Sequence, residues 1–232
     1  MISVVMPAHN ERGYLESAVK SVVTGLRDRG AEFEVVVAEN GSVDGSAVEA
    51  DHLADLYREV TVLHLPVADY GRALRAGFLA THGEIVANFD VDFVDLDFLD
   101  RALQVLEHAE VALVVGSKRA PGAVDQRSAG RKLVTTVFTL MLRRGFGLGV
   151  TDTHGIKAFR RSPLLPIVES CVYGKDIYDT EVVLRAERAG LTVKEMPVSV
   201  AEVRPARTPI VKRIPRSLVG LAKLRLTLWR AD

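Results

Sequence analysis

The feature that most constrains this 232-residue chain is the regular alternation of short β-branched runs and amphipathic segments over its first 116 residues. Apolar residues recur every three or four positions between the runs, which predicts helices there. The expected strands are 2–6, 33–38, 60–65, 85–89 and 111–116, and the expected helices are 15–30, 47–57, 72–81 and 99–106. Strict alternation of this kind is typical of a mostly parallel sheet with helices on both faces. We therefore expect an α/β fold, with Asn10 capping the first helix.

The second half of the chain is less regular. Helices are predicted over 132–143 and 178–189, and strands over 156–159 and 192–198. No internal repeat and no low-complexity linker interrupts the pattern. We expect one domain over residues 1–205, followed by a basic amphipathic tail over residues 206–232.

Length and composition favour a cytoplasmic globular protein. Hydrophobic residues make up 48% of the chain, yet no apolar stretch reaches the roughly 20 residues of a membrane-spanning helix. The N-terminus lacks the charged-then-apolar pattern of a signal peptide. Cys171 is the only cysteine, which excludes an internal disulfide and a cysteine-based metal cluster. We expect a cytoplasmic location, with the inner face of the membrane as the alternative.

The zero net charge hides an asymmetry between the body and the tail. Eight Lys and Arg residues and no acid lie between Arg204 and Arg230. The rest of the chain, apart from Asp232, holds 22 bases against 29 acids. A basic tail on an acidic body indicates an anionic partner, such as a phosphate or a lipid surface. No nucleic-acid-binding motif accompanies the tail, so we expect no nucleic-acid partner.

The tail also has the spacing of an amphipathic helix. Basic residues recur every seven positions on one face, at Arg216, Lys223 and Arg230. Leucines gather on another face, at Leu218, Leu221, Leu224 and Leu228, with Trp229 near the end. Two interpretations remain open: the helix lies at a membrane interface, or it packs its leucines against the body of the protein.

Polar segments follow three of the predicted strands, at 9–11, 39–44 and 90–92. Ligands of open α/β sheets bind beyond the carboxyl ends of the strands, where these segments meet. Asp90 and Asp92 follow an apolar strand directly, and such carboxylates can hold Mg²⁺ or Mn²⁺ against a diphosphate. The metal then stabilises the diphosphate as it leaves. An isolated Asp-x-Asp is weak by itself, because such pairs often cap helices.

Four motifs in order strengthen this interpretation. Residues 4–11 (VVMPAHNE) resemble the opening strand of family-two glycosyltransferases of the GT-A fold, and residues 39–46 (ENGSVDGS) resemble their DDGSxDGT loop. Residues 70–77 (YGRALRAG) are similar to their GxAxRxG helix start, and Asp90-Val91-Asp92 follows at the expected distance. The resemblance implies a GT-A fold, which is a Rossmann-like fold with a mostly parallel central sheet, and a nucleotide-sugar donor.

The resemblance extends beyond the first 116 residues, which we call the donor half. It points to a narrower group within the family. Residues 117–119 (SKR), 155–159 (GIKAF) and 195–198 (EMPV) follow the pattern of dolichol- and polyprenyl-phosphate sugar transferases. Asp152, Glu181 and Gly190 fit the same pattern, and Arg204 matches the arginine after the last core strand. The similarity covers roughly residues 2 to 204.

The resemblance implies roles for individual residues. The residues that it places at or near the nucleoside are Pro7, Ala8, Asn10, Glu11, Glu39, Asp69 and Arg75. Asp90 and Asp92 would hold the metal on the sugar diphosphate. The residues that it assigns to the acceptor phosphate are Arg119, Arg131 and Arg204. Arginine suits that role, because its planar guanidinium donates two hydrogen bonds to neighbouring phosphate oxygens.

Several positions depart from the family pattern. Glu39-Asn40 replaces the usual Asp-Asp, which alters the contact to the donor base. His9 stands where a tyrosine is common. Val94 occupies a position that is often a polar metal neighbour, which leaves Asp95 or water to complete the metal shell.

The expected reaction is an in-line displacement at the anomeric carbon, with inversion. A lipid-phosphate acceptor is already anionic at neutral pH and needs no general base. A hydroxyl acceptor needs a carboxylate within about 3 Å of its proton. The candidates are Asp152, Asp176, Asp179 and Glu181, of which Asp152 and Glu181 match family positions.

Several functions are compatible with these motifs. The resemblance favours transfer of mannose from GDP-mannose to a polyprenyl or dolichyl phosphate. The alternative is transfer from UDP-glucose or a similar donor to a soluble or glycan hydroxyl. A second alternative is a non-catalytic protein that binds nucleotide sugars. A dinucleotide-dependent oxidoreductase is disfavoured, because no GxGxxG motif follows the first strand.

Overall fold

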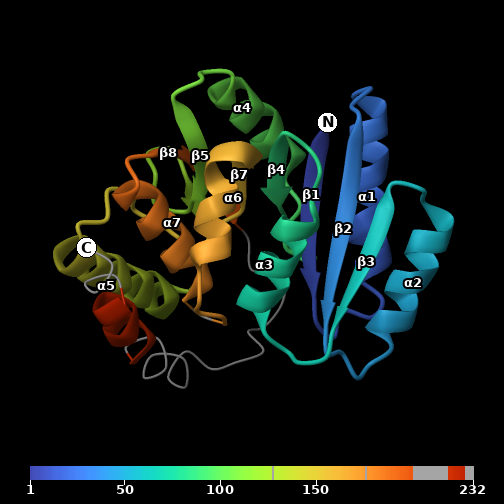
Figure 1. Cartoon of the computed structure of the whole chain (residues 1–232), viewed down its shortest axis with the longest axis horizontal. Coiled ribbons are helices and arrows are strands. Elements are labelled where there is room, and N and C mark those ends of the chain that lie inside the picture. The colour runs from blue at the N-terminus through green and yellow to red at the C-terminus, as the bar shows by residue number, and fades with distance from the viewer. Residues whose placement is uncertain (127, 176, 201–218, 228–232) are drawn as a thin grey trace.

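The computed structural model describes residues 1–126, 128–175, 177–200 and 219–227 (Figure 1). Its core is a seven-stranded sheet in the order β3-β2-β1-β4-β7-β5-β8. The strands are β1 Ile2–Ala8, β2 Phe33–Asn40, β3 Val60–Leu65, β4 Ile85–Asn88, β5 Val111–Ser117, β7 Lys157–Arg160 and β8 Thr192–Pro197. The short strands β6 (Val124–Asp125) and β9 (Ser199–Val200) form a separate pair.

The sheet is mostly parallel, as the alternation predicts. Strands β1 to β4 pair in parallel, and β8 pairs in parallel with β5. β7 is the exception, because it lies antiparallel between β4 and β5. The carboxyl ends of β1, β2 and β3 meet at the lower edge of the sheet in Figure 1. Because β7 runs the other way, its first residue, Lys157, lies at that same edge.

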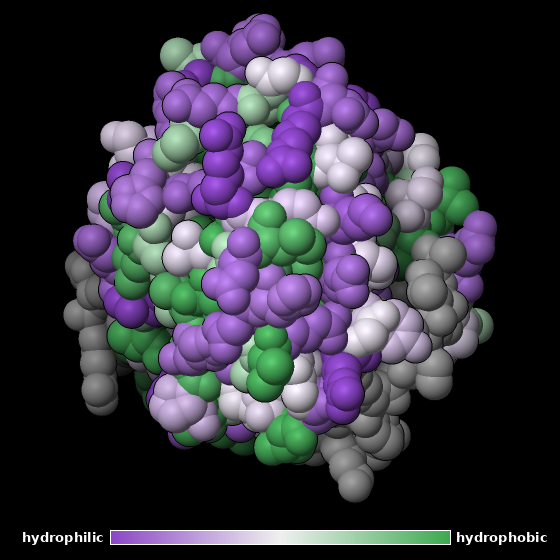
Figure 2. All heavy atoms as spheres, turned by 90° about the vertical axis from the view of Figure 1, so that its right-hand side faces the viewer, coloured by the Kyte–Doolittle hydropathy of each residue, from purple (hydrophilic) through white to green (hydrophobic). Residues whose placement is uncertain are grey.

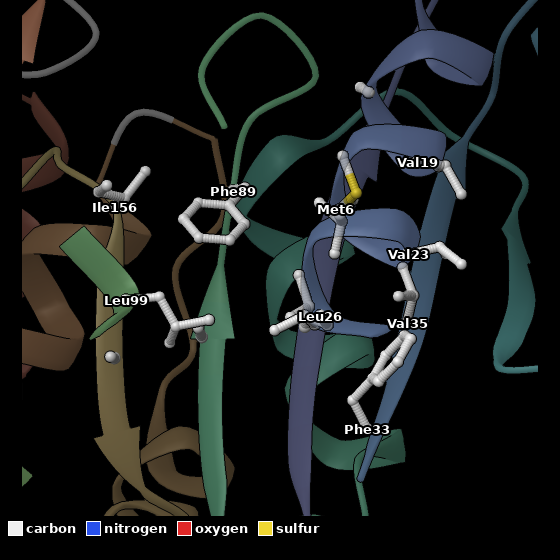
Figure 3. Packing of buried hydrophobic residues seen from close by; sticks show 14 of the residues in the cluster. Met6, Val19, Val23, Leu26, Phe33, Val35, Phe89, Leu99 and Ile156 are labelled. Carbon is white, nitrogen blue, oxygen red and sulfur yellow. The ribbon is translucent and has the colours of Figure 1, made fainter. Parts of the chain in front are cut away.

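Helices cover both faces of the sheet. They are α1 Leu15–Asp28, α2 Ser46–Leu56, α3 Tyr70–Ala80, α4 Leu96–Leu106, α5 Ala129–Phe146, α6 Arg161–Ser170 and α7 Tyr178–Arg188. On one face, α1 and α2 pack over β1, β2 and β3, and α4 packs over β5 and β7, around one apolar cluster. Figure 3 shows this cluster, in which Met6, Val19, Val35 and Leu99 converge from four elements. On the other face, α3, α5, α6 and α7 form a second cluster.

The structure corrects one local prediction and adds one helix that was not predicted. Asn10 does not cap the first helix: α1 begins after Tyr14, and no side chain caps it. Asn10 adopts a left-handed conformation with φ 54°, which turns the chain before the helix. The helix α6 was not predicted, because Pro163 and Pro166 interrupt its pattern.

Part of the predicted tail packs against the body. Residues 219–227 form a helix in which Leu221 and Leu224 are buried in the second cluster. The helix lies beside the end of α5, where Arg225 bonds the carbonyl of Gly145 and stacks over Phe146 (Figure 1). For these two leucines the packing interpretation holds. The tail's other predicted face residues, Arg216, Leu218, Leu228, Trp229 and Arg230, lie outside the described residues.

In the part of the chain that the structure describes, no helix has the length and apolar character to cross a bilayer. The face that carries α2 and β3 is covered mainly by hydrophilic residues with apolar ones among them (Figure 2).

Candidate functional site

The loops that follow β1 and β2, at the carboxyl edge of the sheet, are joined to each other by hydrogen bonds. The loop after β1 donates the Asn10 N–H to Ser42 Oγ (2.9 Å) and the Glu11 N–H to Ser46 Oγ (2.7 Å). In return, Asn10 Oδ1 accepts the Val43 N–H at 2.9 Å. The serines thus satisfy the backbone of the first loop at the edge of the sheet where the donor is predicted to bind.

Asn40, at the end of β2, links three elements. Its amide nitrogen donates to the carbonyl of Ala8 at 2.8 Å, and its Oδ1 accepts the Asp69 N–H at 3.0 Å. His9 Nδ1 lies 2.8 Å from the carbonyl of Asn40. A buried amide with partners on both of its atoms fixes the spacing of β1, β2 and the start of α3. The sequence places Asn40 in a motif but gives no sign of this bridging role.

The predicted nucleoside residues lie in different kinds of place. Pro7 and Ala8 end β1, and Glu11 begins the joined loop. Asp69 caps α3, because Oδ1 accepts the N–H groups of Arg72 (3.0 Å) and Lys175 (2.8 Å). Their role in donor binding remains a prediction.

Arg75 has contacts of another kind. Its guanidinium donates to the carbonyls of Val168 (3.2 Å) and Glu169 (2.9 Å), at the end of α6. Basic side chains commonly satisfy the last carbonyls of a helix in this way. These contacts belong to the packing of α3 on α6 rather than to the predicted pocket.

Asp90 and Asp92 lie on a tight turn that follows β4. The Phe93 N–H donates to the Asp90 carbonyl at 2.9 Å, which closes the turn and leaves Asp92 exposed. Tyr70, at the start of α3, donates its hydroxyl to Asp90 Oδ1 at 3.0 Å. Burial raises the pKa of Asp90 to about 6 against the effect of this hydrogen bond, and the charges of Asp92 and Asp179 add to the rise.

This excess of negative charge fits a divalent cation. A cation held by Asp90 and Asp92 would offset the repulsion between their carboxylates. Within the described residues there is no cluster of three or more His, Cys, Asp or Glu able to hold a metal. Mg²⁺ is usually held by one or two carboxylates together with substrate phosphates and waters, so the pair meets the requirement when a diphosphate is bound.

A buried ion pair lies near the predicted metal site, because Lys157 is paired in the sheet with Asn88, the last residue of β4. Lys157, at the start of β7, donates to Asp179 Oδ1 at 2.5 Å and to the Gly155 carbonyl at 2.8 Å. Lys157 is 1% exposed and Asp179 is 5% exposed. The pairing was missed in the sequence, because 22 residues separate the two side chains. It holds the start of α7 against the edge where the polar loops meet.

Asp152 forms a second buried charge cluster. Its Oδ1 accepts the His154 N–H at 3.0 Å, and its Oδ2 lies 3.7 Å from Lys118 Nζ. Burial opposes ionisation, but the charges of Lys118 and His154 outweigh it and lower the pKa of Asp152. The carboxylate is therefore ionised at neutral pH, as the predicted role of general base requires.

Glu181, the other predicted base, is buried, and its carboxylate is occupied by hydrogen bonds within the protein. Its carboxylate accepts the N–H groups of Val172 and Tyr173 and pairs with Arg185 at 2.8 Å. The residue is 0% exposed, so in this conformation it does not reach the proton of an acceptor. Its contacts hold the 172–173 turn onto α7.

Two of the three residues predicted to bind the acceptor phosphate lie in described segments. Arg119 follows β5 and donates to Thr136 Oγ1 on α5 at 2.5 Å. Arg131 lies in the first turns of the same helix. Arg204, like the predicted base candidate Asp176, lies outside the described residues. The structure thus brings Arg119 and α5 together.

Comparison with known proteins gives a family match over most of this site. The profile described as Glycosyl transferase family 2 matches residues 3–166. This span includes the joined loops, the Asp90–Asp92 turn and Asp152.

Several relatives are similar over nearly the whole chain. An undecaprenyl-phosphate mannosyltransferase of Micrococcus luteus is 30% identical, over 97% of this chain and 92% of that protein. A dolichyl-phosphate beta-glucosyltransferase, ALG5A, of Trichomonas vaginalis is 28% identical, over 87% of this chain and 66% of that protein. Glycosyltransferase AglD of Haloferax volcanii is 28% identical over 98% of this chain, which spans 37% of its length.

Solved structures share the fold. Glucosyl-3-phosphoglycerate synthase of Mycobacterium tuberculosis, in complex with Mn²⁺, UDP-glucose and phosphoglyceric acid, superposes with a TM-score of 0.68. The two chains are 23% identical, over 97% of this chain and 79% of that one. This likeness confirms the predicted α/β fold with its mostly parallel sheet.

Proposed function

Since the chain belongs to glycosyl transferase family 2 and is a glycosyltransferase, we propose that it moves a hexose from a nucleotide sugar to a polyprenyl or dolichyl phosphate, with inversion. GDP-mannose is the favoured donor, because a mannosyltransferase of undecaprenyl phosphate is 30% identical over 92% of its own length. The reaction depends on Mg²⁺ or Mn²⁺.

The observation that carries the lipid acceptor is an apolar stripe on α5. Leu133, Val137, Leu140 and Met141 recur at helical spacing and are between 40% and 65% exposed. The inner side of the same helix is buried, for example at Leu142. The inner apolar face of α5 is covered by the body of the protein, whereas an exposed outer apolar face is typical of an interaction site.

The stripe lies beside a phosphate-binding candidate. Arg119 bonds to Thr136 on α5, so its guanidinium adjoins this helix. The neighbouring helix 219–227 adds Val219 and Leu226, which are seven positions apart and more than half exposed. Apolar side chains next to a basic group match the two parts of a polyprenyl phosphate, and the same surface suits peripheral contact with a bilayer.

The residues of this chain have separable roles in the proposed reaction. The joined loops around Asn10 and Glu39 hold the nucleoside, and Asp90 and Asp92 would hold the metal. When bound, the metal offsets charge on the departing diphosphate. Arg119 and Arg131 orient the acceptor phosphate, whose oxygen forms the new bond to the anomeric carbon. The bond from that carbon to the diphosphate oxygen breaks on the opposite side.

An acceptor phosphate removes the need for a general base. Its oxygen is anionic at neutral pH, so no proton has to be withdrawn during attack. The enclosed carboxylate of Glu181 is consistent with this mechanism. Asp152 then serves to position Lys118 near the acceptor rather than to accept a proton.

A second candidate function is favoured by the structural likeness. The similar synthase of Mycobacterium tuberculosis was crystallised with UDP-glucose and a small phosphorylated acid. On the same fold, this chain would transfer glucose from UDP-glucose to a soluble phosphorylated acceptor. The apolar stripe on α5 has no use in that reaction.

The test is a transfer assay with GDP-[¹⁴C]mannose and UDP-[¹⁴C]glucose, each with Mg²⁺, Mn²⁺ or EDTA. Undecaprenyl phosphate in detergent is offered against 3-phosphoglycerate in buffer. We expect label in the organic phase, lost with EDTA. Label only in the aqueous acceptor would support the second candidate. No transfer, with donor binding intact, would identify a non-catalytic nucleotide-sugar-binding protein.

A further inference from the structure

An imidazole bridges two carboxylates behind the joined loops. His64 Nδ1, on β3, lies 3.2 Å from Glu39 Oε2, and His64 Nε2 lies 2.8 Å from Asp51 Oδ1 on α2. Glu39 is 4% exposed, whereas the side chain of His64 is 45% exposed. A solvent-accessible imidazole therefore contacts a carboxylate that is sealed inside the donor half.

The chemistry of the three groups fixes the state of the imidazole. An ionised carboxylate only accepts hydrogen bonds, and a neutral imidazole has a single N–H to donate. Both contacts are hydrogen bonds only when His64 carries a proton on each nitrogen. Consistent with this geometry, the hydrogen bonds that His64 donates to Asp51 and then to Glu39 raise its pKa.

The other side of Glu39 connects to the loops predicted to bind the nucleoside. Glu39 Oε1 accepts the Ser42 N–H at 2.6 Å, and Ser42 Oγ accepts the Asn10 N–H at 2.9 Å. A continuous chain of hydrogen bonds thus runs from Asp51 at the surface through His64, Glu39 and Ser42 to Asn10. Loss of the proton on His64 removes one bond from this chain.

We propose that His64 is a positioning residue of the donor site, which in its doubly protonated form holds Glu39 and the joined loops in the shape that binds the nucleoside diphosphate. The inference rests on the proposed function, in which Glu39 and Asn10 line the nucleoside pocket. Donor affinity is then coupled to a proton that never touches the donor.

The direction of the pH effect follows from the sign of the pKa change. The pKa of His64 in the folded protein lies above its usual value, so the bridging bonds are complete below that pKa and are lost as pH rises through it. The charged groups that face the imidazole are Glu39 from β2 and Asp51 from α2. Donor affinity should therefore fall with rising pH.

The experiment measures binding of GDP and UDP, each with Mg²⁺, by calorimetry between pH 6 and pH 8.5. We expect affinity of the wild-type protein to fall about tenfold over this range, the order of one charge-assisted hydrogen bond. His64→Gln, which cannot be protonated, should give weaker binding that lacks the fall at high pH. Asp51→Asn keeps the contact to Glu39 and should move the midpoint to lower pH.

A second readout does not depend on donor specificity. NMR titration of the His64 ring should give a pKa that rises when GDP or UDP is bound, because coupling between two equilibria is reciprocal. Identical pH profiles for the wild-type and His64→Gln proteins, with tight metal-dependent binding in both, would overturn the inference and leave the proposed function standing. Binding of neither nucleotide by the folded protein would overturn the proposed function and the inference together.

Discussion

Beyond the ends of β1 and β2, the side chains of Asn10 and Ser42 bond the backbone of a neighbouring loop, whereas after β5 and at the start of β7 charged side chains are paired in the interior. Ser42 and Asn10 illustrate the first arrangement, and Lys157 with Asp179 illustrates the second. Hydrogen bonds to backbone groups fix a shape and hold little net charge. A buried ion pair depends on both partners, because either one alone is an uncompensated charge. Loss of one polar side chain should therefore lower the free energy of unfolding less in the donor half than in the second half.

The largest expected effect concerns Asp92, whose side chain belongs to neither arrangement. Because it is exposed on the turn after β4, Asp92→Asn should leave the fold intact and lower kcat/KM about a thousandfold by removing a metal-binding charge. Rates with GDP-mannose and undecaprenyl phosphate, together with melting temperatures, measure both effects. Asp55→Asn, an exposed change on α2, is the matched control. Full activity of the Asp92→Asn protein would contradict the metal assignment.

Removal of one partner tests the buried pair. Lys157→Met should lower the free energy of unfolding by about 3–5 kcal/mol, because Asp179 is left buried and unpaired. Urea denaturation measures this loss. The exposed pair of Arg29 and Asp100 is the control, where Arg29→Gln should cost less than about 1 kcal/mol.

The double variant Lys157→Met/Asp179→Leu sharpens the same test. With both charges removed, stability should return most of the way to the wild-type value. A double variant as unstable as Lys157→Met alone would show that packing, rather than charge, is responsible.

The apolar stripe on α5 has no counterpart in the donor half. Leu133→Ser/Leu140→Ser should reduce co-sedimentation with anionic vesicles and transfer to undecaprenyl phosphate roughly tenfold, because two exposed apolar contacts are lost. Val48→Ser on α2, at a position that is 73% exposed, should change neither. Donor hydrolysis should be equal in all three proteins. Unchanged vesicle binding after the double substitution would remove the stripe from the acceptor site.

The smallest expected effect concerns Asp95, which caps α4 by accepting the Phe98 N–H at 2.8 Å. Asp95→Ala should cost about 1 kcal/mol of unfolding free energy, and Asp95→Ser, which retains a cap, only a few tenths. Both proteins should keep their metal dependence. A large loss of activity in Asp95→Ser would instead return Asp95 to the metal shell.

The donor half was predictable from sequence because its signals are local. Each strand is a short apolar run, and each polar loop follows a strand directly, so the shared edge follows from topology alone. The link from Tyr70 to Asp90 and the chain from Asn10 to Glu39 then bring residues named in advance into contact. What these residues bind was supplied by resemblance and stays a prediction.

The second half was less predictable because its structure rests on distant pairings. The antiparallel direction of β7 depends on neighbours about 40 to 70 residues away, which no local pattern encodes. Glu181 matched a family position, yet its burial and its contacts to the 172–173 turn become visible only in three dimensions. The helix α6 was not predicted because its sequence contains two prolines, although Pro163 lies in its first turn, where proline is tolerated.

The reversed direction of β7 has a consequence for how such enzymes diversify. β5 and β7 are adjacent antiparallel strands, so residues 118–156 leave the sheet and return to it at the same edge, as one long excursion. The cost of closing such an excursion grows only slowly with its length. It carries Arg119, α5 and Asp152 but no part of β1 to β4. If Arg119 and α5 bind the acceptor as proposed, grafting residues 118–156 between relatives should exchange the acceptor while the donor stays the same.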